Sequence, residues 1–195
     1  MKINLMRNKT AFILFIIFSW QGYSQYKYEK ELHINVSDVP VNALAFVDSL
    51  DFNTKVRWYK EMSYDKISFE AKTRYKGEKH SIEFAKNGSF EDLEIEIKAN
   101  RIPAGVLSGI KEYLNSEFKK FSIQKVQIQY TGDPELILEF FRNKNNMDVI
   151  KIHFEIVIST RLDGSFVMFE YLFSQKGDFI HRTQITLKMT DNLEY

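Results

Sequence analysis

Apolar and polar residues alternate along several stretches of this chain, and this alternation predicts β-strands with one buried face and one exposed face. It is clearest at 66–75, where every second side chain is apolar or Thr and the others are polar or charged. Asn87-Gly88, a dipeptide typical of tight turns, separates two further strands. The pattern favours an antiparallel sheet with one wet face. The strands predicted in the first half are 55–61, 66–75, 80–84 and 92–98.

Two other stretches carry their apolar residues at helical spacing instead. One follows Ser37-Asp38 and Pro40, and the other follows Ile102-Pro103. A proline is tolerated in the first turn of a helix, so both prolines are compatible with helix starts. The second predicted helix leads into a second series of strands. These strands are predicted at 123–130, 150–159, 166–174 and 179–188.

The second half of the chain therefore repeats the order of the first. Ile102-Pro103 corresponds to Val39-Pro40, and the turn at 173–179 corresponds to the turn at 84–90, but at a larger separation. The larger separation indicates an insertion in the second copy, at about 131–149. Within it, 135–142 is either a helix or a strand, because short apolar runs do not distinguish the two.

We accordingly expect an α+β fold of two tandem helix-plus-antiparallel-sheet modules. The first module is predicted at 25–99 and the second, with its insertion, at 100–190. The join at Ala99-Asn100-Arg101 is short. The two modules are therefore expected to abut and to share a sheet edge or a core.

The first 24 residues have the parts of a secretory signal peptide. A positively charged start precedes an apolar run at 11–18, and Gly22 and Ser24 are small residues suited to a cut before Gln25. The apolar run is about half as long as the roughly 20 residues that a membrane-spanning helix requires. We therefore predict an exported protein, periplasmic or secreted, with no stable membrane span after cleavage.

Composition excludes several functions. The 195 residues carry 27 Lys and Arg against 26 Asp and Glu, and this balance argues against a nucleic-acid partner. There is no cysteine, so neither a disulfide framework nor a catalytic thiol is possible. The sequence contains neither a nucleophile motif nor a glycine-rich phosphate loop. We predict that the protein is not an enzyme and uses no cofactor.

The four histidines do not predict a metal site, because none has the spacing of a zinc motif. His80 is expected in the core and His153 on a solvated strand face. Asp92, Glu94 and Glu96 form an acidic stripe on one strand face. This stripe is either a cation site or docking patch for a basic partner, or a solvated face. We favour a solvated face whose acids pair with lysines, for which the candidates are Lys66, Lys72 and Lys79.

Aromatic and large apolar residues suggest where a partner would bind. Trp58 is expected in the core, whereas Tyr59 and Tyr64 stand among charged residues and resemble interface residues. The strand at 166–174 has no polar face. Either the fold covers both of its sides, or an apolar patch is exposed for a partner. The candidate partner-binding residues are Tyr59, Tyr64, Phe166, Met168 and Leu172.

The order of these motifs resembles the PepSY-like proteins of the beta-lactamase-inhibitor-like family. The resemblance is carried by Val39-Pro40, Val56-Arg57-Trp58 and the Asn87-Gly88 turn, together with Ile102-Pro103 and the turn at 173–177 in the second half. It implies an exported binding fold whose sheet presents a surface to a partner protein. It does not imply that this chain inhibits a beta-lactamase or a peptidase.

The sequence thus predicts a non-enzymatic protein that binds another envelope or extracellular protein through an open sheet face. The alternative is a small-ligand or lipid carrier with a cavity between sheet and helices. The oligomeric state is left open by the sequence.

Overall fold

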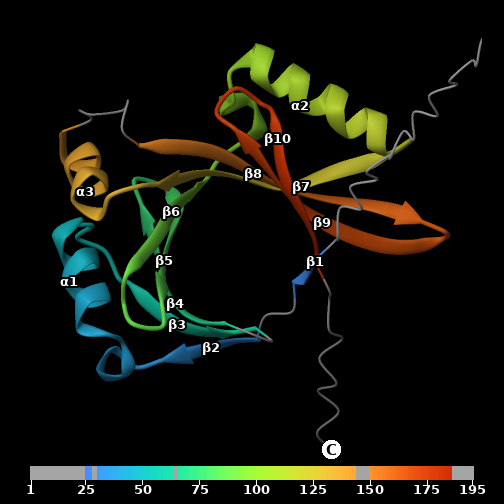
Figure 1. The fold of residues 1–195 in the computed structure, drawn as a ribbon. Helices are drawn as coiled ribbons and strands as arrows, with labels where there is room; N and C mark the ends of the chain where they lie inside the picture. The colour runs from blue at the N-terminus through green and yellow to red at the C-terminus, as the bar shows by residue number, and fades with distance from the viewer. Residues whose placement is uncertain (1–24, 28–29, 64–65, 144–149, 186–195) are drawn as a thin grey trace, which may run out of the picture.

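The fold is taken from a computed structural model that describes residues 25–27, 30–63, 66–143 and 150–185. The predicted signal peptide lies outside the described residues. Figure 1 shows the arrangement of the elements. In chain order they are β1 (Gln25–Lys27), β2 (Lys30–Ile34), the 3-10 turn η1 (Val36–Asp38), α1 (Val41–Ser49), β3 (Arg57–Met62), β4 (Ile67–Tyr75), β5 (Glu78–Ala85), β6 (Phe90–Glu96), the 3-10 turn η2 (Ala99–Arg101), α2 (Ala104–Glu117), β7 (Phe121–Thr131), α3 (Pro134–Asn143), β8 (Lys151–Leu162), β9 (Ser165–Ser174) and β10 (Phe179–Ile185).

All ten strands of the described residues belong to one continuous sheet, in the order β1-β10-β9-β8-β7-β6-β5-β4-β3-β2. The nine strands β2 to β10 are antiparallel to their neighbours, and β1 adds to the β10 edge in parallel. The predicted division into two helix-plus-sheet modules is wrong. Strand β6 pairs with β7, with Leu93 opposite Tyr130, so the ladder runs without interruption across the predicted join. Alternation specifies strands, but it does not specify where a sheet stops.

The sheet is strongly curved. A flat sheet of ten strands would hold its two edges roughly 43 Å apart, because neighbouring strands are about 4.8 Å apart. Here β1 and β2 are the two edges, yet only two residues separate Lys27 from Lys30 in the chain. Three Cα–Cα steps span at most about 11 Å. The sheet therefore curls round until its edges approach each other, and its inner face is concave (Figure 1).

The three α-helices pack on the outer, convex face (Figure 1). Cross-strand register shows which residues share that face: Thr73, His80, Ile95, Ile128, Phe154 and Phe173 follow one another from β4 to β9. Ring contacts join the helices to it. Phe46 of α1 stacks on Phe90 with ring centroids 4.6 Å apart, and Tyr113 of α2 lies 5.7 Å from Phe173.

This layer between helices and sheet is the hydrophobic core. Its largest fully buried side chains include Tyr171, Phe84 and Phe173. Trp58 is 4% exposed, which confirms its predicted place in the core. His80 is also buried there, as predicted, with its ring against Phe52 and Tyr75.

Two glycines let hairpin turns approach the helices closely. Gly88 has a φ of +83°, and a Cβ at this position would lie 2.6 Å from the Cβ of Pro40. Gly177 has a φ of +90°, and a Cβ there would lie 3.2 Å from Val106. A residue with a side chain is strained at such positive φ angles and would also push against the helix. The turn at Gly88 therefore fixes the start of α1, and the turn at Gly177 fixes α2.

The structure decides some open points and adds elements that the pattern did not predict. The insertion contains the helix α3, which begins after Asp133, whose side chain accepts hydrogen bonds from the backbone amides of Glu135 and Leu136. Strands β1 and β2 were not predicted, because both are short and lie at sheet edges. Among the described helices, none combines the length and apolar character needed to cross a bilayer.

Candidate functional site: the concave face of the sheet

The concave face carries the side chains that alternate with the core. Register places Lys72, Ser81, Glu94, Gln129, His153 and Ser174 in one row from β4 to β9. A parallel row holds Glu96, Gln127, Glu155 and Leu172. In the part of the chain that the structure describes, no helix packs on this face (Figure 1). The curvature crowds these side chains together, so several charged and polar groups on it are largely buried.

Two acids and two amides form an interlocked set at the centre of this face, which we call the acid–amide ladder: Asp92, Glu94, Gln127 and Gln129. Nε2 of Gln127 donates to Oε2 of Glu94 at 2.5 Å. Nε2 of Gln129 donates to Oε1 of Glu94 at 3.2 Å and to Oδ2 of Asp92 at 3.5 Å. Glu94 is only 6% exposed, so both of its oxygens depend on these amide donors instead of water.

Burial and like charges act together on the two acids of the ladder. Desolvation raises the pKa of Glu94 well above its ordinary value, and repulsion from Glu155, Asp92 and Glu83 raises it further, against a smaller effect of Lys125. The pKa of Asp92 is raised in the same way, by desolvation and then by neighbouring acids. The charges of this part of the face are therefore under-compensated, and a positive charge brought to the ladder would be stabilised.

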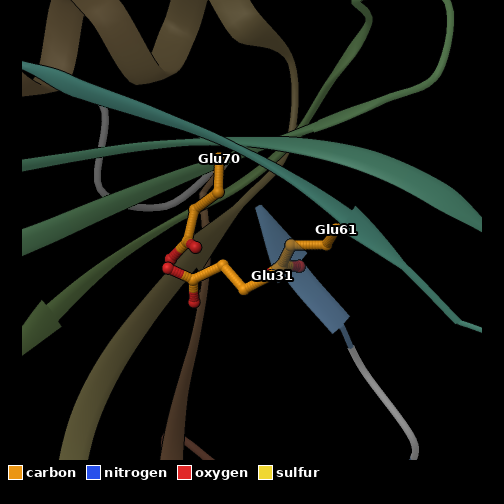
Figure 2. Close-up of side chains that lie close together, drawn as sticks. All are labelled: Glu31, Glu61 and Glu70. Atoms are coloured by element: carbon orange, nitrogen blue, oxygen red, sulfur yellow. The ribbon is translucent and has the colours of Figure 1, made fainter. Parts of the chain in front are cut away.

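Further toward the β2 edge, three carboxylates converge around a lysine. The ligand atoms of Glu31, Glu61 and Glu70 lie within 4.8 Å of one another. Figure 2 shows the carboxylates of Glu31 and Glu70 turned toward each other. The Nζ atom of Lys72 lies 2.8 Å from Glu31 Oε2 and 2.8 Å from Glu70 Oε2. This ammonium already neutralises the pair, and a metal ion here would have to displace it. Burial alone would lower the pKa of Lys72, but Glu70 and Glu31 raise it above its ordinary value.

Strand β9 gives the concave face an apolar part. Phe166 is 59% exposed, next to the turn that joins β8 to β9, while Met168 and Leu172 are half-buried further along the strand. The neighbouring side chain of Val157 on β8 is buried. On the other side of the same strand, Phe169, Tyr171 and Phe173 pack beneath α2. The concave side of β9 therefore carries three apolar side chains, with Glu170 between Met168 and Leu172, and only the convex side is covered by a helix.

Of the sequence-predicted binding residues, Phe166, Met168 and Leu172 lie together on the concave face. Tyr59 is on the same face but on β3, close to the other edge of the sheet, where its ring contacts Lys72 Nζ (4.9 Å) and His33 (5.5 Å between ring centroids). Tyr64 lies outside the described residues. The structure thus groups three of the five and places Tyr59 beside the carboxylate cluster.

The expectation of a solvated acidic stripe holds for one end only. Glu96 is partly exposed and pairs with Lys79 at 2.9 Å, as predicted. Glu94 is buried and pairs with amides, so for this residue the expectation is wrong. The other two predicted lysines pair elsewhere, Lys66 with Glu91 at 2.6 Å and Lys72 with Glu31 and Glu70.

His153 was predicted on a solvated strand face, and this prediction is wrong. It is half-buried on the concave face, and desolvation followed by repulsion from Lys151 lowers its pKa. The sequence signal for the ladder was the spacing of Gln127 and Gln129 on a predicted strand. It becomes meaningful only once β7 is known to pair with β6.

The chain is similar in part to several solved structures from Bacteroides. No protein-family model matches the sequence, and no curated protein matches it. A DUF2874 family protein from Bacteroides ovatus is 10% identical, with a TM-score of 0.49, over 75% of this chain and 87% of that chain. A BLIP-like protein from Bacteroides fragilis is 16% identical, with a TM-score of 0.44, over 80% and 92%. A protein described as a candidate periplasmic protein from Bacteroides eggerthii is 14% identical, with a TM-score of 0.49, over 75% and 88%.

One of these proteins is described as BLIP-like, but with TM-scores below 0.5 the likeness carries no argument about the family of this chain. The resemblance to PepSY-like and beta-lactamase-inhibitor-like proteins remains a prediction. Likeness at this level does not say what this chain binds, so its function has to be argued from its own residues.

Proposed function

We propose that this chain is an exported, non-enzymatic binding protein that holds a protein partner against the concave face of its sheet. The observation that carries the proposal is the asymmetry of the two sheet faces. All three described α-helices pack on the convex face, while the concave face presents the apolar side chains Phe166, Met168 and Leu172 of β9 beside a charged and amide-rich centre.

The composition of the concave face suits a protein surface. Interfaces combine a few large apolar or aromatic anchors with surrounding polar groups that make hydrogen bonds. Phe166, Met168 and Leu172 would supply the anchors, and Tyr59 would supply a second aromatic contact across the curve. Because the face is concave, a protruding loop or an extended segment of the partner would contact both parts at once.

The alternative of a small-ligand or lipid carrier has less support. It requires a cavity between the sheet and the helices. In the described part of the chain, that layer is occupied by packed rings: Phe46 contacts Phe84 and Phe90, and Phe118 stacks on Phe169. These buried side chains fill the space between sheet and helices that an apolar ligand would have to occupy.

Site-specific photocrosslinking in the native cell tests the proposal. The photoreactive residue p-benzoylphenylalanine would replace Phe166 or Leu172 on the concave face, and Lys111 on the exposed surface of α2 as the matched control. We expect both concave positions to capture the same envelope or extracellular protein, and the control position not to capture it. Once that protein is purified, Phe166→Ala should weaken its binding to the chain. Capture from position 111 alone, or from no position, would overturn the proposal.

A further inference from the structure

The acid–amide ladder has acceptors without donors. Oδ1 of Asp92 and Oε1 of Gln127 are both buried atoms with no hydrogen-bond partner among the described residues. The Gln127 side chain is only 6% exposed. Its amide cannot simply turn over, because the oxygen would then meet the carboxylate of Glu94, to which the nitrogen now donates. A buried acceptor left without a donor costs free energy, so these atoms require a donor from elsewhere.

The charges around these two oxygens indicate that the missing donor carries a positive charge. Glu83, Glu94 and Glu155 all lie close enough to Asp92 or to one another to raise the pKa values of the ladder acids by repulsion. Two lysines act on the ladder acids: Lys125, whose Nζ lies 3.6 Å from Glu155 Oε1, and Lys66, whose Nζ lies 2.6 Å from Glu91 Oε2. Each of them is paired with an acid outside the ladder, so negative charge remains in excess around Asp92 and Glu94. A positively charged donor therefore satisfies both the hydrogen bonding and the electrostatics.

The spacing of the acceptors favours an organic cation over a metal ion. A metal ion needs several oxygens within a few ångströms of a single point. Among the described residues, three such groups converge within 4.8 Å only at Glu31, Glu61 and Glu70, where Lys72 already sits. The ladder acceptors are instead distributed along β6 and β7, which are neighbouring strands about 4.8 Å apart. A guanidinium group presents five donors in a planar fork and can reach acceptors on two strands at once.

We infer that the acid–amide ladder is the subsite for an arginine side chain of the protein partner. Asp92 and Glu94 supply the charge, and Oδ1 of Asp92 and Oε1 of Gln127 accept from the guanidinium. The inference rests on the proposed function, because it specifies the chemistry of the partner that lies on the concave face. The exposed Phe166 would anchor the partner on β9 while the arginine enters the centre of the sheet.

Isothermal titration calorimetry of the full chain, as the cell processes it, tests the subsite without the partner. The probes are a hexa-arginine peptide and a hexa-citrulline peptide, which has nearly the same shape and no charge. We expect hexa-arginine to bind and hexa-citrulline not to bind. Glu94→Gln should weaken the binding of hexa-arginine by about tenfold or more, as should Asp92→Asn. Equal binding of both peptides, or no binding of either, would contradict the subsite.

A matched control separates the ladder from general negative charge. Glu96→Gln removes the same charge from the same strand, but Glu96 is already paired with Lys79 at 2.9 Å. It should weaken the binding of hexa-arginine less than twofold. If Glu96→Gln and Glu94→Gln weakened binding equally, the peptide would be attracted by the net charge of the protein and the inference would fail. Thermal unfolding of each variant checks that it is folded.

The same variants separate failure of the inference from failure of the proposed function. If the crosslinked partner is captured as well by Glu94→Gln as by the wild type, the arginine subsite is wrong and the binding role stands. If hexa-arginine binds the ladder but no position on the concave face captures a protein, the subsite stands as a cation site and the proposed role as a protein-binding module fails.

Discussion

Replacing Glu94 with glutamine should stabilise the protein at neutral and alkaline pH. The change removes one charge from the buried ladder and leaves the side-chain volume almost unchanged. It also keeps the hydrogen bonds that the wild type makes to position 94. The amide of Gln127 can turn over, so that its Oε1 accepts from the new amide, while Gln129 continues to donate to the new carbonyl oxygen. The wild-type carboxylate is 6% exposed and repelled by Glu155, Asp92 and Glu83.

The sign of the effect depends on pH. Below about pH 4 the carboxyl group is protonated in both the folded and the unfolded chain. As the pH rises, the unfolded chain loses the proton first, because burial raises the pKa of Glu94 in the folded state. The folded state then binds more protons than the unfolded state, so the free energy of unfolding falls as the pH rises through this window. Asp92 contributes in the same direction, under the influence of Glu83, Glu155, Glu91 and Lys66. Glu94→Gln removes one of these two contributions.

The magnitude follows from opposing terms. Desolvating a buried carboxylate costs several kcal/mol, and the amide hydrogen bonds to Glu94 return only part of that cost. Weaker hydrogen bonds to a neutral acceptor offset about 1 kcal/mol of the gain. We expect a net stabilisation on the order of 1 kcal/mol at pH 8, which raises the Tm by about 2–4 °C for a chain of this size. At pH 4 the gain should vanish.

Thermal unfolding followed by circular dichroism at pH 4 and pH 8 measures this difference. Glu96→Gln is the control, because it breaks an exposed ion pair with Lys79 and should lower stability by about 0.2–1 kcal/mol at pH 8. The two substitutions on one strand should therefore have opposite signs. A decrease in Tm for Glu94→Gln at pH 8, or a change equal at both pH values, would refute the account of the ladder as a set of repelling acids.

Three other predictions concern packing and exposure, and one of them has a control substitution. Gly88→Ala should lower the free energy of unfolding in urea by about 2–4 kcal/mol, because it adds a clash with Pro40 to the strain of a positive φ. The control Gly77→Ala should cost only about 1 kcal/mol, because Gly77 has a φ of +84° but no atom within 4 Å. Equal costs would show that the turn does not hold α1. Phe84→Ala should cost about 3–5 kcal/mol, since Phe84 is fully buried against three rings; a cost below about 1 kcal/mol would contradict the assigned core. Phe166→Ala should change the free energy of unfolding by less than about 0.5 kcal/mol, because the side chain is 59% exposed, and a large loss would show that Phe166 serves the fold and not a partner.

Local pattern was sufficient to predict most of the strands and the two main helices. Alternation along 66–75 placed Phe69 and Ala71 on the buried side, and helical spacing placed Phe46 and Ile110 in the core. Both predictions depend on which way neighbouring side chains point, and that is set within a few residues. The same locality explains the correct place of Trp58.

Long-range pairing could not be predicted from the same pattern. The short join at 99–101 predicted that the two modules would share a sheet edge or a core, but no residue on either strand specifies the pairing of β6 with β7. The ladder follows from it, because Glu94 meets Gln127 and Gln129 only when those strands are neighbours. Without knowledge of that pairing, Glu94 is predicted to be one more acid on a solvent-exposed strand face. The curvature that crowds it belongs to the whole sheet, whose edge strands β1 and β2 approach each other.

A stabilising Glu94→Gln that also abolishes binding would have a clear meaning. Functional sites commonly retain groups that reduce stability, because those groups are needed for a ligand. The uncompensated charge and the unpartnered oxygens of the ladder are such groups if the partner brings the missing cation.

The central claim is that a partner protein binds to the concave face of the sheet. Side-chain amide signals of Gln127 and Gln129, measured by NMR with and without the captured partner, test it most directly, with Asn42 on α1 and Asn115 on α2 as reporters of the helix-covered side. The account predicts that the two glutamine signals shift while the two asparagine signals stay in place. Shifts of Asn42 or Asn115, with Gln127 and Gln129 unchanged, would contradict it.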